Sequence, residues 1–162
     1  APADLLVYGM GEQQLIRKGQ EKLTPELDRI QLAILKAFCQ YRKPVFGICK
    51  GMQLINIAFG GDMLRHLPTA VHHAYREKDQ MHPARNEVNS FLYEVYGSDM
   101  LVNSAHHQGV GIPGRGIRYV QYAPDGVVEG LQHEFLPVYG VQWHPERLER
   151  DIKKLKKLFK IT

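Results

Sequence analysis

Cys49 lies where two sequence patterns meet, and its type and position suggest a nucleophile. The apolar run from Val45 to Ile48 is typical of a buried strand, and apolar residues recur at helical spacing after Gly51. Glycines stand two residues before and two residues after the cysteine, at Gly47 and Gly51. This G-x-C-x-G layout predicts a nucleophile elbow, a strand-to-helix turn so sharp that larger flanking residues would collide. The competing interpretation is a buried free cysteine at a strand end.

A thiol at this position needs help to react at neutral pH, because its unperturbed pKa is about 8.5. The helix N-terminus favours a thiolate, and His144 is the best candidate for the base. It follows a predicted strand and is the only histidine with an acid two residues further on. In an extended His144-Pro145-Glu146 segment the two side chains point the same way. Glu146 would then accept a hydrogen bond from one ring nitrogen and turn the other toward the thiol.

Acyl transfer to a cysteine passes through an oxyanion, which backbone N–H groups can stabilise. The N–H of Lys50, at the start of the predicted helix, is placed to do so. A second donor is expected in the Gly-Met-Gly turn at 9–11, which follows a predicted strand at 4–8, and we assign it to Met10. An ordinary turn is the alternative interpretation of these glycines.

Histidines gather in two further stretches of the chain. Residues 65–83 form a long polar connection with four histidines, whose spacing to acids and cysteines does not fit a zinc site. We expect no metal there, and we interpret the connection as a lid over the site. His106 and His107 follow another predicted strand and are candidates for a substrate wall, with structural and exposed histidines as the alternative. The histidines of the connection are His66, His72, His73 and His82.

Strands alternate with helices along most of the chain, which predicts an α/β fold with a mostly parallel sheet. In such sheets ligands bind beyond the carboxyl ends of the strands. Gly9, Cys49, the histidine pair at 106–107 and His144 all fall at such ends, so we expect them to line one crevice. Strands are predicted at 4–8, 45–48, 62–64, 84–88, 100–104, 117–123, 127–132 and 138–143, and helices at 24–41, 50–59, 90–96 and 151–162.

Length and composition favour one ordinary globular domain over residues 1–162. The net charge of +4 comes entirely from residues 146–162, which carry seven basic and three acidic residues. No basic face interleaved with aromatics is present, so we expect no nucleic-acid partner. No run approaches the length of a membrane span, and the C-terminal helix is expected to dock on the sheet with its lysines solvated. Two cysteines make no disulfide framework, so we expect a cytoplasmic protein.

Four motifs resemble those of class I glutamine amidotransferases, and the last two narrow the resemblance to the γ-glutamyl-γ-aminobutyrate hydrolase branch, peptidase family C26. The resemblance runs from about residue 4 to residue 158. The motifs are Gly47-Ile48-Cys49-Lys50-Gly51-Met52-Gln53, Gln142-Trp143-His144-Pro145-Glu146, Asn103-Ser104-Ala105-His106-His107-Gln108 and Pro124-Asp125-Gly126-Val127-Val128-Glu129.

This resemblance implies a flavodoxin-like, doubly wound sheet and a nucleophile, base and orienting acid at Cys49, His144 and Glu146. It implies that Gln53 helps to hold a γ-glutamyl group, and that His106 and His107 line the site, with the one that faces the substrate left open. The implied reaction is hydrolysis of a γ-glutamyl amide through a glutamyl thioester, without metal or cofactor. The implied partner is therefore a small molecule.

The sequence departs from the family pattern in two places. Family members begin with two further strand–helix units, so an apolar sheet edge would be left uncovered here. We expect either that this sequence is a fragment of a longer chain or that another segment or a second copy completes the sheet. Met10 also stands where the family has a glycine, so this turn carries a side chain at a position where glycine would leave φ freer. Two alternatives to a stand-alone hydrolase stay open: a glutaminase subunit that passes ammonia to a synthase, and a non-catalytic relative that binds a γ-glutamyl metabolite or a partner protein.

Overall fold

The computed structural model describes residues 6–8, 25–64, 80–104 and 109–159. Helices separate the first strands, and antiparallel strands follow before a final helix. The helices are α2 (Pro25–Gln40), α3 (Lys50–Ala58), α4 (Phe91–Tyr96), the 3-10 helix η2 (Pro145–Arg147) and α5 (Glu149–Leu158). The strands are β1 (Leu6–Tyr8), β2 (Val45–Ile48), β3 (Met63–Leu64), β4 (Gln80–Asn86), β5 (Asp99–Ser104), β6 (Gly109–Val110), β7 (Ile117–Tyr122), β8 (Val128–His133) and β9 (Val138–Val141).

Seven of these strands form one sheet in the order β1-β2-β9-β8-β7-β4-β5, and β3 pairs with β6 apart from it. Strands β1, β2 and β9 are parallel, and the other neighbours pair antiparallel. The predicted α/β class is confirmed, with a mixed sheet whose parallel strands gather on one side. Short turns join β7 to β8 and β8 to β9, and such turns can only connect antiparallel strands. Within the described residues β1 lies at one edge of the sheet.

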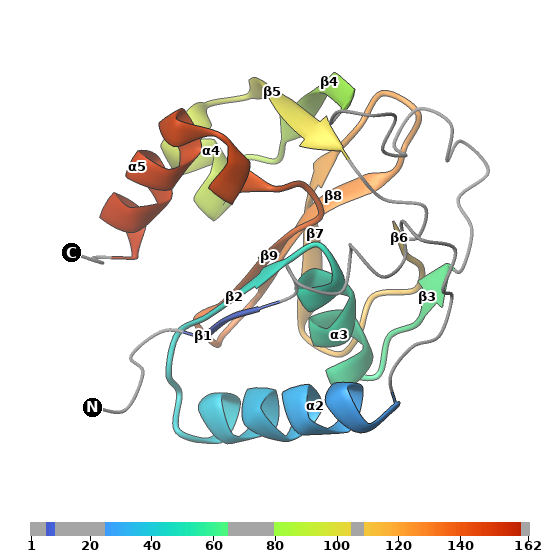
Figure 1. Cartoon of the computed structure of the whole chain (residues 1–162). Coiled ribbons are helices and arrows are strands. Elements are labelled where there is room, and N and C mark those ends of the chain that lie inside the picture. Colours follow the sequence, from blue (N-terminus) through green and yellow to red (C-terminus); the bar gives the residue numbers. More distant parts are fainter. Residues whose placement is uncertain (1–5, 9–24, 65–79, 105–108, 160–162) are drawn as a thin grey trace.

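The parallel strands lie between two helical layers, with α2 and α3 on one side and α4 and α5 on the other (Figure 1). Successive residues of β2 face opposite layers, as the period of a strand requires. Val45 joins the core beneath α2 and α3, whereas Phe46 and Ile48 join the core beneath α4 and α5. All four residues of β2 are buried. This burial on both faces explains the unbroken apolar run in the sequence.

Helix α4 forms as the sequence predicts, because both its ends are capped locally. The hydroxyl of Ser90 accepts a hydrogen bond from the N–H of Tyr93 over 3.1 Å, which satisfies one free donor of the first turn. Gly97 ends the helix with a φ of 79°, a conformation that glycine adopts without strain. The predicted boundaries of this helix are thus confirmed.

Strand β4 begins four residues earlier than predicted, at Gln80, so His82 lies in a strand and not in the long connection. Pro83 is tolerated there because β4 pairs with β7 only at Arg85 and Asn86, which leaves Pro83 paired with β5 alone. Helix α5 likewise begins two residues earlier than predicted, at Glu149.

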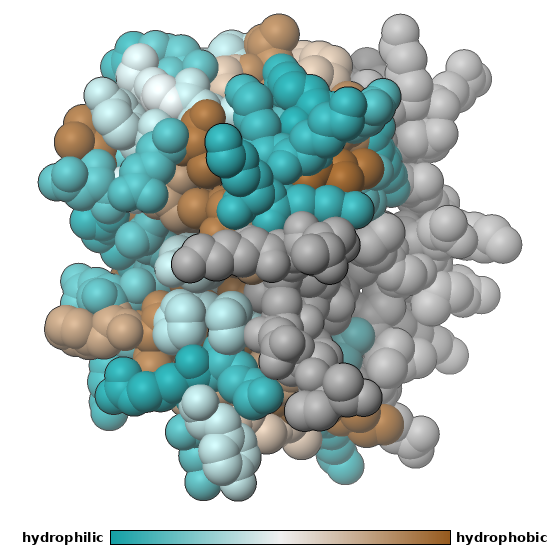
Figure 2. Space-filling model, turned by 90° about the vertical axis from the view of Figure 1, so that its left-hand side faces the viewer, coloured by the Kyte–Doolittle hydropathy of each residue, from teal (hydrophilic) through white to brown (hydrophobic). Residues whose placement is uncertain are grey.

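The C-terminal helix α5 docks on the sheet with its lysines exposed, as predicted. Leu155 is buried, and the four lysines of this helix face solvent. Figure 2 shows the molecule from the left of Figure 1, and the upper part of the surface that faces the viewer there is largely hydrophilic. Within the described residues, the helices are all too short or too polar to cross a membrane.

Candidate active site

The predicted elbow is present at Cys49, between the end of β2 and the start of α3. Cys49 has φ 54° and ψ −106°, a sparsely populated conformation for a residue with a side chain. Gly47 has the predicted steric role. A Cβ on Gly47 would lie 2.6 Å from the carbonyl carbon of Gly51 and 2.6 Å from Cδ1 of Ile55, so strand and helix could not approach this closely with a larger residue. Strained backbone of this kind typically marks a functional site.

Cys49 is fully buried, and its backbone is bound to β9, the parallel neighbour of β2. Its N–H donates to the carbonyl of Val141 over 2.8 Å, which continues the β2–β9 ladder past Ile48. Gln142, the residue after β9, donates from Nε2 to Cys49 Sγ over 3.2 Å. The carboxyl ends of β2 and β9 therefore bring the cysteine beside the stretch that carries His144.

Lys50 serves the site through its backbone, because its side chain is engaged elsewhere. Its N–H hydrogen-bonds the Cys49 thiol and lowers the pKa of that thiol. Its ammonium pairs with Asp28 on α2 over 2.7 Å, in a nearly buried position. This ion pair fixes the first turn of α3, which carries the N–H of Lys50, to α2.

His144 and Glu146 form the predicted pair, but not on an extended segment. Nδ1 of His144 donates to Oε1 of Glu146 over 2.7 Å. Pro145 opens the 3-10 helix η2, so the chain turns directly after His144, where an extended segment was expected. Proline fits the first position of such a turn because its φ is fixed and it has no N–H to satisfy. The other ring nitrogen, Nε2, is buried and has no hydrogen-bond partner among the described residues.

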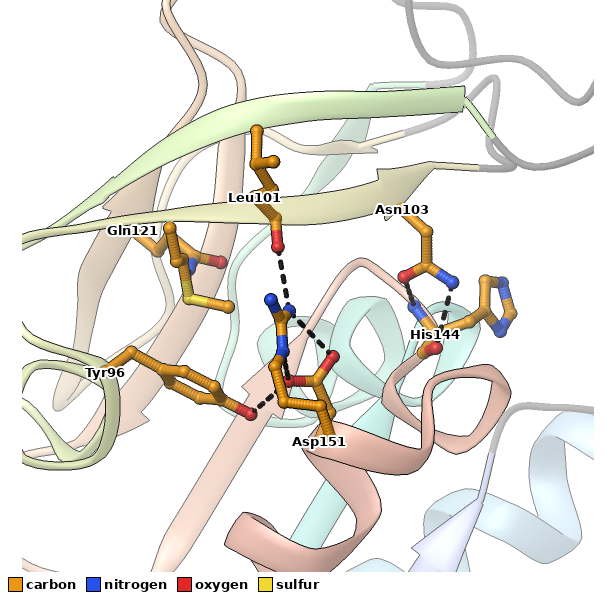
Figure 3. A network of polar contacts seen from close by, with 8 residues as sticks. Tyr96, Leu101, Asn103, Gln121, His144 and Asp151 are labelled. Carbon is orange, nitrogen blue, oxygen red and sulfur yellow. Dashed lines mark hydrogen bonds and ion pairs between the residues drawn. The ribbon is translucent and has the colours of Figure 1, made fainter.

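Asn103 at the end of β5 holds the backbone of His144 from both sides (Figure 3). Its Nδ2 donates to the carbonyl of His144 over 3.0 Å, and its Oδ1 accepts from the N–H of His144 over 3.1 Å. All four groups are buried, so the amide satisfies donors and acceptors that water cannot reach. Residue 144 is thus fixed by a side chain 41 positions away in sequence.

A second polar network fixes the chain after His144 (Figure 3). Asp151 is fully buried on α5 and accepts from the hydroxyl of Tyr96 over 2.8 Å and from Nε of Arg150 over 2.9 Å. Arg150 also donates to the carbonyl of Leu101 on β5 over 3.1 Å. Helix α5 is therefore tied to α4 and β5, which fixes the start of the helix that directly follows η2.

The environment of Cys49 keeps its thiol protonated. Burial is the main cause that raises the pKa of Cys49 far above its usual value, and the carboxylates of Glu146 and Glu129 raise it further. The hydrogen bonds from Gln142 and from the N–H of Lys50 act in the opposite direction and lower it. Because the balance favours the neutral thiol, a reaction at Cys49 requires a base that removes its proton in the step itself.

A second histidine–carboxylate pair joins His82 on β4 to Glu129 on β8. Nε2 of His82 lies 3.6 Å from Oε1 of Glu129, and its Nδ1 lies 3.0 Å from the carbonyl of Pro83. The side chain of Glu129 is fully buried. The sequence placed Glu129 in a motif and His82 in a lid, and gave no reason to pair them.

Three predicted site residues lie outside the described residues: Met10, His106 and His107. Gln53 is described, and its amide contacts Gln142, with Gln53 Nε2 3.1 Å from Gln142 Oε1. Among the described residues no group of three or more metal-ligating side chains occurs. Of the four histidines in the predicted lid, His82 alone belongs to the described part, and it lies in β4.

Sequence reasoning missed Gln142 and the role of Asn103, although both lie in quoted motifs. A polar residue at the end of a buried strand, next to a candidate base, could have singled out Gln142. No local pattern could have shown that the amide of Asn103 meets the backbone of His144.

Comparison with known proteins shows what this chain resembles. The sequence profile described as Peptidase C26 matches residues 9–146. The γ-glutamyl-γ-aminobutyrate hydrolase PuuD of Escherichia coli K12 is 33% identical over 139 residues, which cover 75% of this chain and 53% of that protein. Protein NtpR of Enterococcus hirae is 33% identical over 130 residues, which cover 74% of this chain and 54% of that protein. The chain thus spans about half the length of these curated relatives.

Solved structures with the same fold include glutamine amidotransferases. The enzyme from Thermotoga maritima matches with a TM-score of 0.67 at 17% identity, over 97% of this chain and 62% of that one. The enzyme from Methylobacillus flagellatus matches with a TM-score of 0.60 at 22% identity, over 85% of this chain and 51% of that one. These likenesses confirm the predicted fold class, that of class I glutamine amidotransferases.

Proposed function

Because the chain belongs to the peptidase C26 family, we propose that it hydrolyses γ-glutamyl amides with Cys49 as nucleophile, His144 as base and Glu146 as the acid that orients it. One observation carries the proposal: a strained, buried cysteine and a tightly paired histidine follow two adjacent parallel strands. The substrate class is supported by the likeness to γ-glutamyl-γ-aminobutyrate hydrolases.

The reaction begins when His144 Nε2 takes the thiol proton and the sulfur attacks the γ-carbonyl carbon of the amide. The C–S bond forms, the carbonyl electrons move to oxygen, and Glu146 stabilises the imidazolium. Collapse of the oxyanion breaks the C–N bond, and His144 gives its proton to the departing amine. Water then attacks the thioester with His144 as base, the C–S bond breaks, and glutamate leaves as the thiol regains its proton.

The oxyanion is bound by the N–H of Lys50 and by a second N–H, which we assign to Met10. Lys50 suits this role because its ion pair with Asp28 fixes the first turn of α3. Gln53, His106 and His107 are the proposed contacts to the γ-glutamyl group. No step needs a metal or a redox cofactor, because the thiol, imidazole and water carry every bond change.

A glutaminase subunit that delivers ammonia to a synthase is the second candidate function. The same three residues would serve it, and the fold is shared with solved glutamine amidotransferases. Such a subunit would have almost no glutaminase activity alone and would become active in complex with its synthase.

The test measures release of glutamate and amine from purified protein given γ-glutamyl-γ-aminobutyrate, other γ-glutamyl amines or glutamine. We expect turnover of γ-glutamyl amines by the protein alone, lost in Cys49→Ser. Turnover of glutamine only in the presence of a synthase would favour the subunit. Binding of γ-glutamyl compounds without turnover would contradict both and support a non-catalytic relative.

A further inference from the structure

Gln142 places a buried side-chain amide directly against the proposed nucleophile. Its Nε2 donates to Cys49 Sγ over 3.2 Å, and both side chains are fully buried. The contact joins residues 93 positions apart, so it results from the alignment of β9 with β2. A neutral thiol sulfur is a weak acceptor, whereas hydrogen bonds to an ionised acceptor are about twice as strong as neutral ones. The contact therefore gains most strength when Cys49 loses its proton.

The orientation of this amide is set by Gln53 on α3. Gln53 Nε2 donates to Gln142 Oε1 over 3.1 Å. Because the oxygen of Gln142 is used in this bond, its nitrogen is turned toward Cys49. The backbone of Gln142 is fixed as well, since its N–H donates to the carbonyl of Glu129 on β8 over 2.8 Å. A short chain of hydrogen bonds, from Gln53 through Gln142, thus ends on the sulfur.

The buried environment of Cys49 makes a hydrogen-bond donor to its sulfur important when the thiolate forms. Burial and two nearby carboxylates, Glu146 and Glu129, oppose a negative charge on Cys49. The ammonium of Lys50 pairs with Asp28. Among the described contacts, the N–H of Lys50 and the amide of Gln142 both donate to the sulfur. Since the N–H of Lys50 is also assigned to the oxyanion, the amide of Gln142 is the one of these two donors that can stay with the sulfur.

We infer that Gln142 is a further catalytic residue, whose amide donates to the Cys49 sulfur as the thiolate forms and again as it leaves the thioester. The inference rests on the proposed function for its chemistry and on the observed contact for its geometry. In the first step the thiol proton passes to His144 and Gln142 stabilises the sulfur left behind. In the last step water adds, the C–S bond breaks, and Gln142 donates to the departing sulfur before His144 returns the proton.

The experiment follows alkylation of Cys49 by iodoacetamide in a Cys39→Ala background, where Cys49 is the only thiol. Below the pKa of a thiol the alkylation rate follows the thiolate fraction, so it reports the donor without any substrate. We expect Gln142→Glu and Gln142→Met to be alkylated about 10- to 100-fold more slowly, because each loses a hydrogen bond to a charged group. The hydrolysis rate kcat is expected to fall by a similar factor.

Gln121→Met is the matched control, because Gln121 is an equally buried glutamine that binds Trp143 and Asn86 and not Cys49. It is expected to lower stability and to leave the alkylation rate of Cys49 unchanged. Gln53→Met retains Gln142 and removes the bond that orients it. We expect slower alkylation in the same direction and by a smaller factor, which keeps the test decisive if the Gln142 variants do not fold.

An alkylation rate of Cys49 that is unchanged in both Gln142 variants would overturn the inference. Gln142→Glu retains an acceptor and loses the amide donor, so a wild-type alkylation rate and wild-type activity in this variant would also overturn it. Failure of the proposed function is a separate outcome. If the wild-type protein hydrolyses no γ-glutamyl amide, the proposed function fails, while the alkylation series still decides whether Gln142 stabilises the thiolate.

Discussion

Two histidine–carboxylate pairs lie in the described structure, and they differ in how closely each is held. His144 and Glu146 are two residues apart in sequence and approach to 2.7 Å, with the His144 side chain 1% exposed. His82 and Glu129 come from β4 and β8, which are not adjacent strands, and lie 3.6 Å apart. The first pair has hydrogen-bond geometry, and the second is only within ion-pair range.

The two pairs also differ in the ring nitrogen that faces the carboxylate. Nδ1 of His144 binds Glu146, and its Nε2 has no hydrogen-bond partner among the described residues. Asn103 fixes the backbone of His144. His82 directs Nε2 itself toward the carboxylate of Glu129. We therefore assign the base to His144, whereas Glu129 acts on the site through its charge, which raises the pKa of Cys49 less than Glu146 does.

The largest expected effect separates the two histidines. We predict that His144→Ala lowers kcat/KM at least about a thousandfold, because the thiol loses its base. His82→Ala is expected to lower kcat/KM much less, because the imidazole of His82 faces Glu129 and takes no part in the proposed proton transfer. Steady-state hydrolysis of a γ-glutamyl amide measures both. Equal losses in the two variants would break the distinction.

Glu146→Gln tests the carboxylate of the tight pair. We predict a loss of at least about a hundredfold in kcat, because the amide removes the charge that stabilises the imidazolium and no longer fixes the ring tautomer. Glu129→Gln is the control, and it removes an equally negative side chain from the looser pair. Its kcat is expected to stay the same or rise, since removing that charge lowers the pKa of Cys49. A larger loss in Glu129→Gln than in Glu146→Gln would reverse our assignment.

Asn103→Leu tests whether the two hydrogen bonds from Asn103 to the backbone of His144 help to position the base. Both the N–H and the carbonyl of His144 would lose a buried partner, so we predict kcat about 10- to 100-fold lower with little change in KM. Asn103→Asp retains the acceptor for the N–H of His144 and is expected to fall in between. If Asn103 were only structural, Asn103→Leu would have a lower unfolding free energy and the same pH profile of kcat/KM as the wild type. A shifted pH profile would support a role of Asn103 in positioning the base.

The smallest expected effect concerns stability at high pH. Burial raises the pKa of Cys49, so the folded chain keeps a proton that the unfolded chain loses above about pH 8.5. The folded state then binds more protons, and its unfolding free energy falls as the pH rises, by at most about 1.4 kcal/mol per pH unit from this group. Cys49→Ala is expected to flatten this slope in urea titrations between neutral and alkaline pH.

Cys39→Ala provides the comparison for that slope. Burial raises the pKa of Cys39 as well, but Cys39 is only partly buried, so removing it should flatten the slope less. An identical slope in the wild type and in Cys49→Ala would show that the thiol does not carry the predicted proton.

Much of the site could be predicted from sequence because its parts are local. The elbow depends on two glycines and one cysteine within five residues, and His144 and Glu146 are linked through one proline. Even so, the predicted extended segment at Pro145 was wrong. A 3-10 turn brings the same two side chains together, because the pairing depends on the short link more than on its conformation.

Contacts between distant segments were beyond local reasoning. The α/β class, the turn at Cys49 and the pairing of His144 with Glu146 could be predicted from the sequence, because each follows from periodicity or from spacings of a few residues. The contact of Gln142 with Cys49 and that of Asn103 with His144 join residues 93 and 41 positions apart, and they are visible only in the tertiary structure. The order and register of strands set these contacts, and both are fixed by packing of the whole sheet between its helical layers.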